Sequence, residues 1–154
     1  MGKTIGKSFL IVVALLLASC TASEKPRVAD AIAPAPAYQD FGDLRVHFNA
    51  MPTLALGEAM AREVPIERSA GTAMVTVALR RLANGEETAA EGEVQAVAVD
   101  LQGMRQPISL TSVRTGGYTD YVGTFRIAER DSYRVEIEVK SGNRRGKVTF
   151  QRNF

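Results

Sequence analysis

His47 is the only histidine in the 154-residue chain, and it stands four residues before Met51. Imidazole nitrogens and thioether sulfurs bind copper ions, and thioethers favour Cu(I) in particular. Methionine also fills cores, however, and the sequence has no His-x-Met or Met-x-Met cluster around these two residues or around Met60, Met74 and Met104. Two interpretations of His47 follow: a structural histidine that bonds a neighbouring loop and fixes its strand, or one ligand of a copper site with Met51.

Motifs that support catalysis are missing from the sequence. It has no Gly-x-Ser-x-Gly nucleophile turn, no His-Glu-x-x-His zinc motif and no glycine-rich phosphate loop. The carboxylate pairs Glu86/Glu87 and Glu136/Glu138 fall in a turn or on an outward strand face, where we expect water to solvate them. The arginine pairs at 80–81 and 144–145 are interpreted as ordinary surface residues. We therefore predict that the chain is not an enzyme and needs no cofactor.

Cys20 is the only cysteine, and it follows a segment typical of export signals. Lys3 and Lys7 precede an apolar run at 9–18, which is too short for a bilayer because crossing needs about 20 residues. The run closes in Leu-Ala-Ser-Cys, which resembles the lipobox of bacterial lipoproteins, where cleavage precedes a cysteine that carries diacylglycerol. We predict a signal peptide at 1–19 and a lipid anchor on Cys20. The alternative is an ordinary signal peptide with a chance cysteine.

The predicted anchor determines location and partners. Acyl chains contribute about 0.8 kcal/mol per buried methylene, so two or three chains hold a protein stably on a membrane that it does not span. Related lipoproteins with aspartate after the cysteine tend to stay in the inner membrane, so Thr21 favours the periplasmic face of the outer membrane. Removing Lys3 and Lys7 with the signal leaves 17 basic and 17 acidic side chains. This balance argues against a nucleic-acid partner.

Composition divides the mature chain into two parts. Residues 20–38 hold the lipidated cysteine and an Ala- and Pro-rich segment without an apolar period, which we interpret as a flexible linker. About 17 such residues span roughly 20–25 Å. Residues 39–154 are predicted to form one domain, which has to be stable without a disulfide.

The domain shows the period of two that is typical of half-buried strands. The period begins at Phe41, and the first strand places Leu44, Val46 and Phe48 on one face before it stops at Met51-Pro52. Residues 53–65 follow with a four-residue period that indicates a short helical turn ended by Pro65. Six further strands are expected at 72–82, 91–101, 107–115, 118–127, 133–140 and 147–150. Seven short strands with regularly spaced turns predict an all-β fold, an immunoglobulin-like antiparallel β-sandwich.

The beginning of the domain resembles a known family. A glycine followed by a Val-His-aromatic-Asn-Ala core is the opening motif of an uncharacterised bacterial envelope family, domain of unknown function 4426. The matching residues are Gly42, Val46, His47, Phe48, Asn49 and Ala50. The closing residues 150–154 are also similar. The resemblance implies a small periplasmic immunoglobulin-like domain and brings no established activity with it.

We therefore expect a membrane-anchored periplasmic lipoprotein that acts as a non-enzymatic protein-binding or structural module of the cell envelope. Its expected partners are membrane lipid, through acylated Cys20, and another envelope protein. The alternative function is copper binding or delivery by His47 and methionines.

Overall fold

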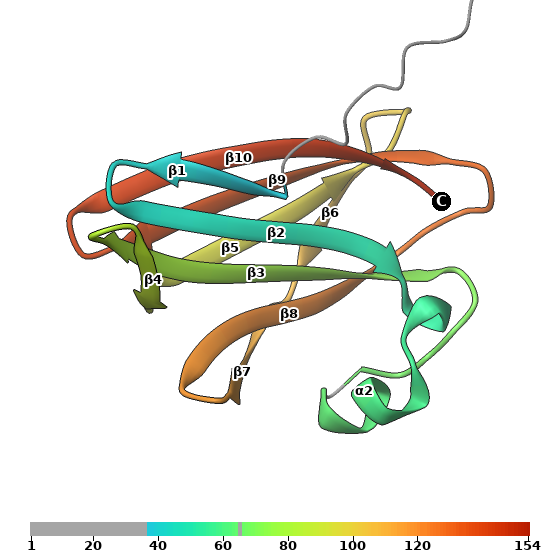
Figure 1. Ribbon diagram of the computed structural model, residues 1–154. Helices are drawn as coiled ribbons and strands as arrows, with labels where there is room; N and C mark the ends of the chain where they lie inside the picture. The colour runs from blue at the N-terminus through green and yellow to red at the C-terminus, as the bar shows by residue number, and fades with distance from the viewer. Residues whose placement is uncertain (1–36, 65) are drawn as a thin grey trace, which may run out of the picture. The chain divides into compact units, whose positions relative to one another are not determined.

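Strand β9 (Ser132–Ser141) shows how alternating residues build this fold. Tyr133, Val135, Ile137 and Val139 are each at most 4% exposed, whereas the polar residues between them face outward. A strand of this kind needs a second apolar layer to cover its inner face. The computed structural model, which describes residues 37–64 and 66–154, supplies that layer as a second sheet (Figure 1).

Two antiparallel sheets face each other. Sheet A contains, in spatial order, β1 (Tyr38–Phe41), β2 (Leu44–Pro52), β3 (Thr72–Ala83), β8 (Tyr118–Arg126) and β7 (Thr111–Thr115), and β4 (Glu86–Ala89) also pairs with β3. Sheet B contains β10 (Arg144–Asn153), β9, β5 (Glu93–Val99) and β6 (Arg105–Ile108). The predicted all-β, immunoglobulin-like antiparallel sandwich is confirmed.

The core lies between the inner faces of the sheets. A fully buried aliphatic side chain contributes about 1.5–3 kcal/mol to the stability of the fold relative to the same side chain in water. The largest buried aliphatic side chains come from β2 and β3 on one side and from β9 and β10 on the other: Leu44, Val46, Val75, Val77, Leu79, Val135, Ile137 and Val148.

The two ends of the sandwich differ, as Figure 1 shows. At one end, which we call the turn end, two-residue turns at 42–43, 84–85 and 142–143 close hairpins. At the other, the loop end, lie the longer connections 53–71, 100–104 and 127–131. The strand registers agree with this division, because Pro52 pairs with Ala73 while Leu44 pairs with Arg81.

The predicted helical segment is confirmed as a 3-10 turn, η1 (Thr53–Ala55), followed by α2 (Glu58–Glu63). The segment covers part of the outer face of sheet A through a small second cluster, in which Leu56, Met74 and Val122 are buried. In the part of the chain that the structure describes, no helix is long and apolar enough to cross a membrane.

The described residues form ten strands, whereas the sequence predicted about seven. Strands β1 and β4 were missed because each has only four residues. The segment 107–115, predicted as one strand, is two: β6 belongs to sheet B and β7 to sheet A. The chain changes sheets at 109–110 beside Gly123, where a Cβ would lie 2.5 Å from the Ser109 carbonyl oxygen. The alternation of apolar and polar residues in the sequence does not show where the chain passes from one sheet to the other.

A close contact joins the two sheets at one edge of the sandwich. A Cβ on Gly146 of β10 would lie 2.5–2.6 Å from ring atoms of Phe41 on β1. We expect Gly146→Ala to lower the free energy of unfolding by about 1–3 kcal/mol, because overpacking forces side chains and backbone to shift. Gly57→Ala is the control, since nothing lies within 4 Å of a Cβ there. Urea unfolding measures both variants, and equal effects would contradict this role of Phe41.

Candidate functional site

His47 lies on the outer face of sheet A, in the middle of β2. Its Nε2 atom is 2.8 Å from Glu87 Oε2 on β4. Because an ionised carboxylate only accepts hydrogen bonds, this geometry places a proton on Nε2. Strand β4 does not pair with β2, so the side chain of Glu87 reaches across β3 to His47. These contacts fit the structural interpretation of His47. Its partner lies on the short strand β4, whereas the sequence predicted a loop.

Four further contacts surround this pair. Arg45 binds Asp40 with both Nε (2.7 Å) and Nη2 (2.9 Å), and its Nη1 donates to Glu87 Oε1 at 2.9 Å. The guanidinium also lies 4.0 Å from the centre of the Tyr38 ring. We call these five residues the His47 cluster. Hydrogen bonds from Arg45 lower the pKa of Glu87 and that of Asp40 below their ordinary values, so both carboxylates stay ionised.

Sequence reasoning missed most of this cluster. It placed Glu87 in solvent, which is wrong: the side chain is one-third exposed and both carboxylate oxygens are bonded. A signal for the rest does exist, because Gly42-Asp43 is a hairpin turn signal and a two-residue turn there puts Asp40 opposite Arg45. The prediction placed the first strand in one run from Phe41 to Met51-Pro52 and therefore did not use this signal.

The structure does not bring His47 and Met51 together. They share one face of β2 four residues apart, which is about 13 Å along a strand. Met51 and Met74 pack in the small cluster with Leu56, and Arg45 already occupies the carboxylate beside His47. Among the described residues, no three His, Cys, Asp or Glu side chains are grouped to hold a metal ion. His47 and Met51 therefore do not form an assembled set of copper ligands in the described residues.

The residues of the resembling motif hold the fold together. Gly42 turns with φ +68°, and Val46 and Ala50 are buried. Phe48 stacks on Phe150 with ring centres 4.8 Å apart, and Asn49 accepts a hydrogen bond from Arg152 at 3.1 Å. The motif therefore joins β2 to β10 in the other sheet. Cys20, the predicted lipid attachment point, lies outside the described residues.

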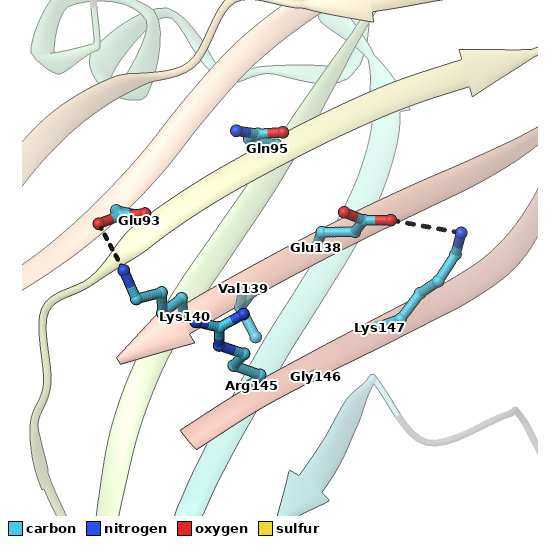
Figure 2. Close-up of a pocket in the computed structure, with 8 residues that line it drawn as sticks. All are labelled: Glu93, Gln95, Glu138, Val139, Lys140, Arg145, Gly146 and Lys147. Atoms are coloured by element: carbon cyan, nitrogen blue, oxygen red, sulfur yellow. Dashed lines mark hydrogen bonds and ion pairs between the residues drawn. The ribbon is translucent and has the colours of Figure 1, made fainter. Parts of the chain in front are cut away.

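The outer face of sheet B holds a broad, shallow depression of about 450 Å³ (Figure 2). We call it the charged face. Figure 2 shows ion pairs that cross from β9 to both of its neighbours: Lys140 to Glu93 at 3.2 Å and Lys147 to Glu138 at 3.4 Å. The lining residues come from β5, β9 and β10: Glu93, Gln95, Glu138, Val139, Lys140, Arg145, Gly146 and Lys147.

Arg145 differs from the other charged residues of the charged face, which form ion pairs. It lies directly opposite Lys140 in the register of β9 and β10, and it makes no ion pair with any described residue. Like charges in opposed positions destabilise a strand pair, so this arrangement has a small cost in folding free energy. Nearby, Arg105 and Arg134 hydrogen-bond to Glu136 and lower the pKa of that carboxyl. Because Arg145 is paired with no described residue, its positive charge remains available to a partner.

Comparison with known proteins decides the family. The family model described as "Domain of unknown function (DUF4426)" matches residues 38–154. The chain belongs to the DUF4426 family. No protein with a curated description matches the chain.

Two solved structures resemble this DUF4426 domain. A DUF4426 family protein from Pseudomonas aeruginosa PAO1 is 26% identical, with a TM-score of 0.63, over 76% of this chain and 92% of that one. A copper-bound variant of FetP from uropathogenic Escherichia coli strain F11 is 7% identical, with a TM-score of 0.55, over 76% and 93% of the two chains. The second likeness shows a shared fold alone.

The His47 cluster makes stability depend on pH. The folded-state pKa of Glu87 lies below 4.5, so its contribution is present above that pH and is lost as the pH falls through the lowered pKa. We expect Glu87→Gln to lower the free energy of unfolding at neutral pH by about 0.5–1 kcal/mol, because a partly exposed ion pair is screened by solvent. The variant also flattens the decline between about pH 5 and pH 2.

Urea unfolding across that pH range measures this effect. Glu86→Gln is the matched control, since Glu86 lies on the same strand, is exposed and has a side chain that makes no hydrogen bond with any described residue. A Glu87→Gln variant with the same pH profile as wild type would rule out the stabilising role.

Proposed function

We propose that this DUF4426 protein is a periplasmic lipoprotein and a non-enzymatic module that binds another envelope protein. The observation that carries the proposal is the charged face of sheet B. It is an open surface on which side chains from three strands stand side by side, with Arg145 unpaired among the described residues (Figure 2). Protein interfaces are broad surfaces with a polar, solvent-accessible rim, whereas small-molecule sites are concave and mostly apolar.

Strand β10 extends the charged face to an edge of the sheet. It has ten residues and hydrogen-bonds to β9 on one side. The side chains of Arg145 and Lys147 stand on this edge strand, and charged residues there are a usual defence against unwanted strand pairing. They also select a partner, because opposite charge favours binding and like charge opposes it. The partner surface that fits is therefore acidic.

The described residues offer no assembled catalytic group that would favour an enzyme. His47 has an acid beside it, but that acid is shared with Arg45, and the cluster has no cysteine or serine. The depression on the charged face holds carboxylates, yet those of Glu93 and Glu138 are paired with lysines. Binding is the activity that this geometry supports.

The charged face can be tested by reversing the two positive charges on its edge strand, the unpaired Arg145 and the paired Lys147. We expect Arg145→Glu/Lys147→Glu to reduce recovery of the partner from detergent-solubilised native membranes at least tenfold, since several kcal/mol of like-charge repulsion replace attraction. Arg62→Glu/Arg114→Glu is the control with the same change in net charge, because both arginines are more than 70% exposed and lie elsewhere. Equal recovery with both double variants, or turnover of a substrate by the purified protein, would refute the proposal.

The anchor is the second part of the proposal, and it rests on the sequence around Cys20. We expect wild-type protein to fractionate with membranes and to carry an acyl mass on its N-terminal peptide. Cys20→Ser should move the protein to the soluble fraction, because two or three acyl chains supply the membrane affinity. Mass spectrometry and fractionation in high salt measure both results. A Cys20→Ser protein that has lost residues 1–19 and still stays fully membrane-bound would contradict lipid anchoring.

A further inference from the structure

Strand β10 is the only long strand at a sheet edge in the part of the chain that the structure describes. The edge strands β1, β4, β6 and β7 have four or five residues each, whereas β10 has ten. It contains no proline, and its register with β9 runs without a bulge from Arg144 to Asn153. Natural edge strands are usually short, bulged or interrupted by proline, because their unpaired backbone groups can recruit another strand. Strand β10 has none of these features.

The backbone of β10 alternates between bonding to β9 and facing away from it. In an antiparallel pair, the residues that exchange hydrogen bonds with a given neighbour occur at every second position. The Phe154 amide donates to the Asp131 carbonyl at 3.0 Å, and this bond continues the register of the two strands. The even-numbered residues therefore bond to β9. The amide and carbonyl groups of the odd-numbered residues, from Arg145 to Gln151, point to the free edge.

The side chains of these odd-numbered residues determine which strand can bind. They are exposed on the outer face of sheet B, and two of them, Arg145 and Lys147, are basic (Figure 2). Residues 142–154 include four basic side chains and no acidic one. A second copy of β10 would bring only further basic side chains to this edge, so charge does not favour pairing between two copies. A strand that carries carboxylates matches the edge.

The inner side of the same strand is apolar. The Phe41 ring lies against Gly146, and Phe150 stacks on Phe48, and all three rings are only partly buried. Side chains of an added strand would alternate between the two faces of sheet B. Carboxylates opposite Arg145 therefore alternate with residues that point to the inner side, near these rings. Apolar residues fit those positions.

We propose that β10 binds its partner by strand addition, in which an extended segment with alternating acidic and apolar residues lies antiparallel to β10. The inference rests on the proposed binding function and specifies the chemistry of the partner. Main-chain hydrogen bonds supply affinity, and the side chains supply specificity. Arg145 contributes most, because Lys147 is already paired with Glu138. Antiparallel addition continues the pattern of the described sheets, in which every strand pair is antiparallel.

Backbone methylation distinguishes strand addition from simple charge attraction. The probe is a fluorescent peptide of alternating glutamate and valine, and its anisotropy reports binding to the full-length protein in detergent. In an antiparallel pair, directly opposed residues exchange hydrogen bonds, so glutamates opposite Arg145 and Lys147 direct their amides to β10. We expect N-methylation of the glutamates to weaken binding about tenfold or more, because it removes those donors. N-methylation of the valines, which leaves the same charge, should have little effect.

Three results with these peptides would overturn the inference. They are equal binding by the two methylated peptides, a larger loss on methylation of the valines, and no binding of the unmodified peptide. All of these measurements use the wild-type protein, so they do not depend on the folding of any variant.

A variant of β10 extends the test to the natural partner. Thr149→Pro removes an amide that faces the free edge and changes no charge, and edge strands tolerate proline at such positions. We expect this variant to reduce recovery of the partner from detergent-solubilised native membranes about tenfold, because the proline ring blocks the approach of another strand. Thr149→Ala is the matched control and should recover the partner like wild type. Circular dichroism verifies that both variants fold.

The outcomes separate this inference from the proposed function. If Thr149→Pro recovers the partner like wild type while Arg145→Glu/Lys147→Glu loses it, the charged face binds through side chains alone. The proposed function then stands, and strand addition is wrong. If neither variant changes recovery, both are wrong. If Thr149→Pro does not fold, the two methylated peptides decide.

Discussion

The packing of two apolar sheet faces against each other is the interaction on which the rest of this structure depends. The only cysteine precedes the described residues, so no disulfide joins the sheets. The buried side chains of β2 and β3 meet those of β9 and β10, and each layer covers a surface that neither could keep in water alone. At one edge the Phe41 ring fills the space that Gly146 leaves, and Phe48 stacks on Phe150. Phe48 belongs to the family motif of β2, so that motif helps to join the two sheets.

The inner faces form the core, and the two outer faces of the sandwich differ from each other. Parts of the outer face of sheet A are covered, by the His47 cluster along β1, β2 and β4 and by α2 with its small apolar cluster towards the loop end. The only histidine is therefore bound into a network that ties β1 and β4 to the sheet. Sheet B leaves its outer face open, with charges arranged in pairs and one arginine left over (Figure 2). For this reason we propose that sheet B binds a partner and that His47 stabilises the fold.

The sequence allowed the layers to be predicted, but it did not show which charged residues meet. Strand β9 was foreseen because Tyr133, Val135, Ile137 and Val139 alternate with charged residues, and half-buried strands require that pattern. Strands β1 and β4 were missed because four residues give too short a period. Glu87 was misjudged for a different reason: its partners, Arg45 and His47, are some forty residues away, and only the sheet order brings them together. Charged side chains carry no periodic signal for their partners.

The most direct test of this account is whether the two sheets unfold as one unit. Native-state hydrogen exchange in low concentrations of denaturant reports the opening free energy of each amide. If packing between the inner faces holds the domain together, the slowest amides of β3 around Val77 and of β9 around Ile137 share a single opening free energy and the same dependence on denaturant. Different opening free energies for the two strands, with one sheet still protected after the other has opened, would contradict it.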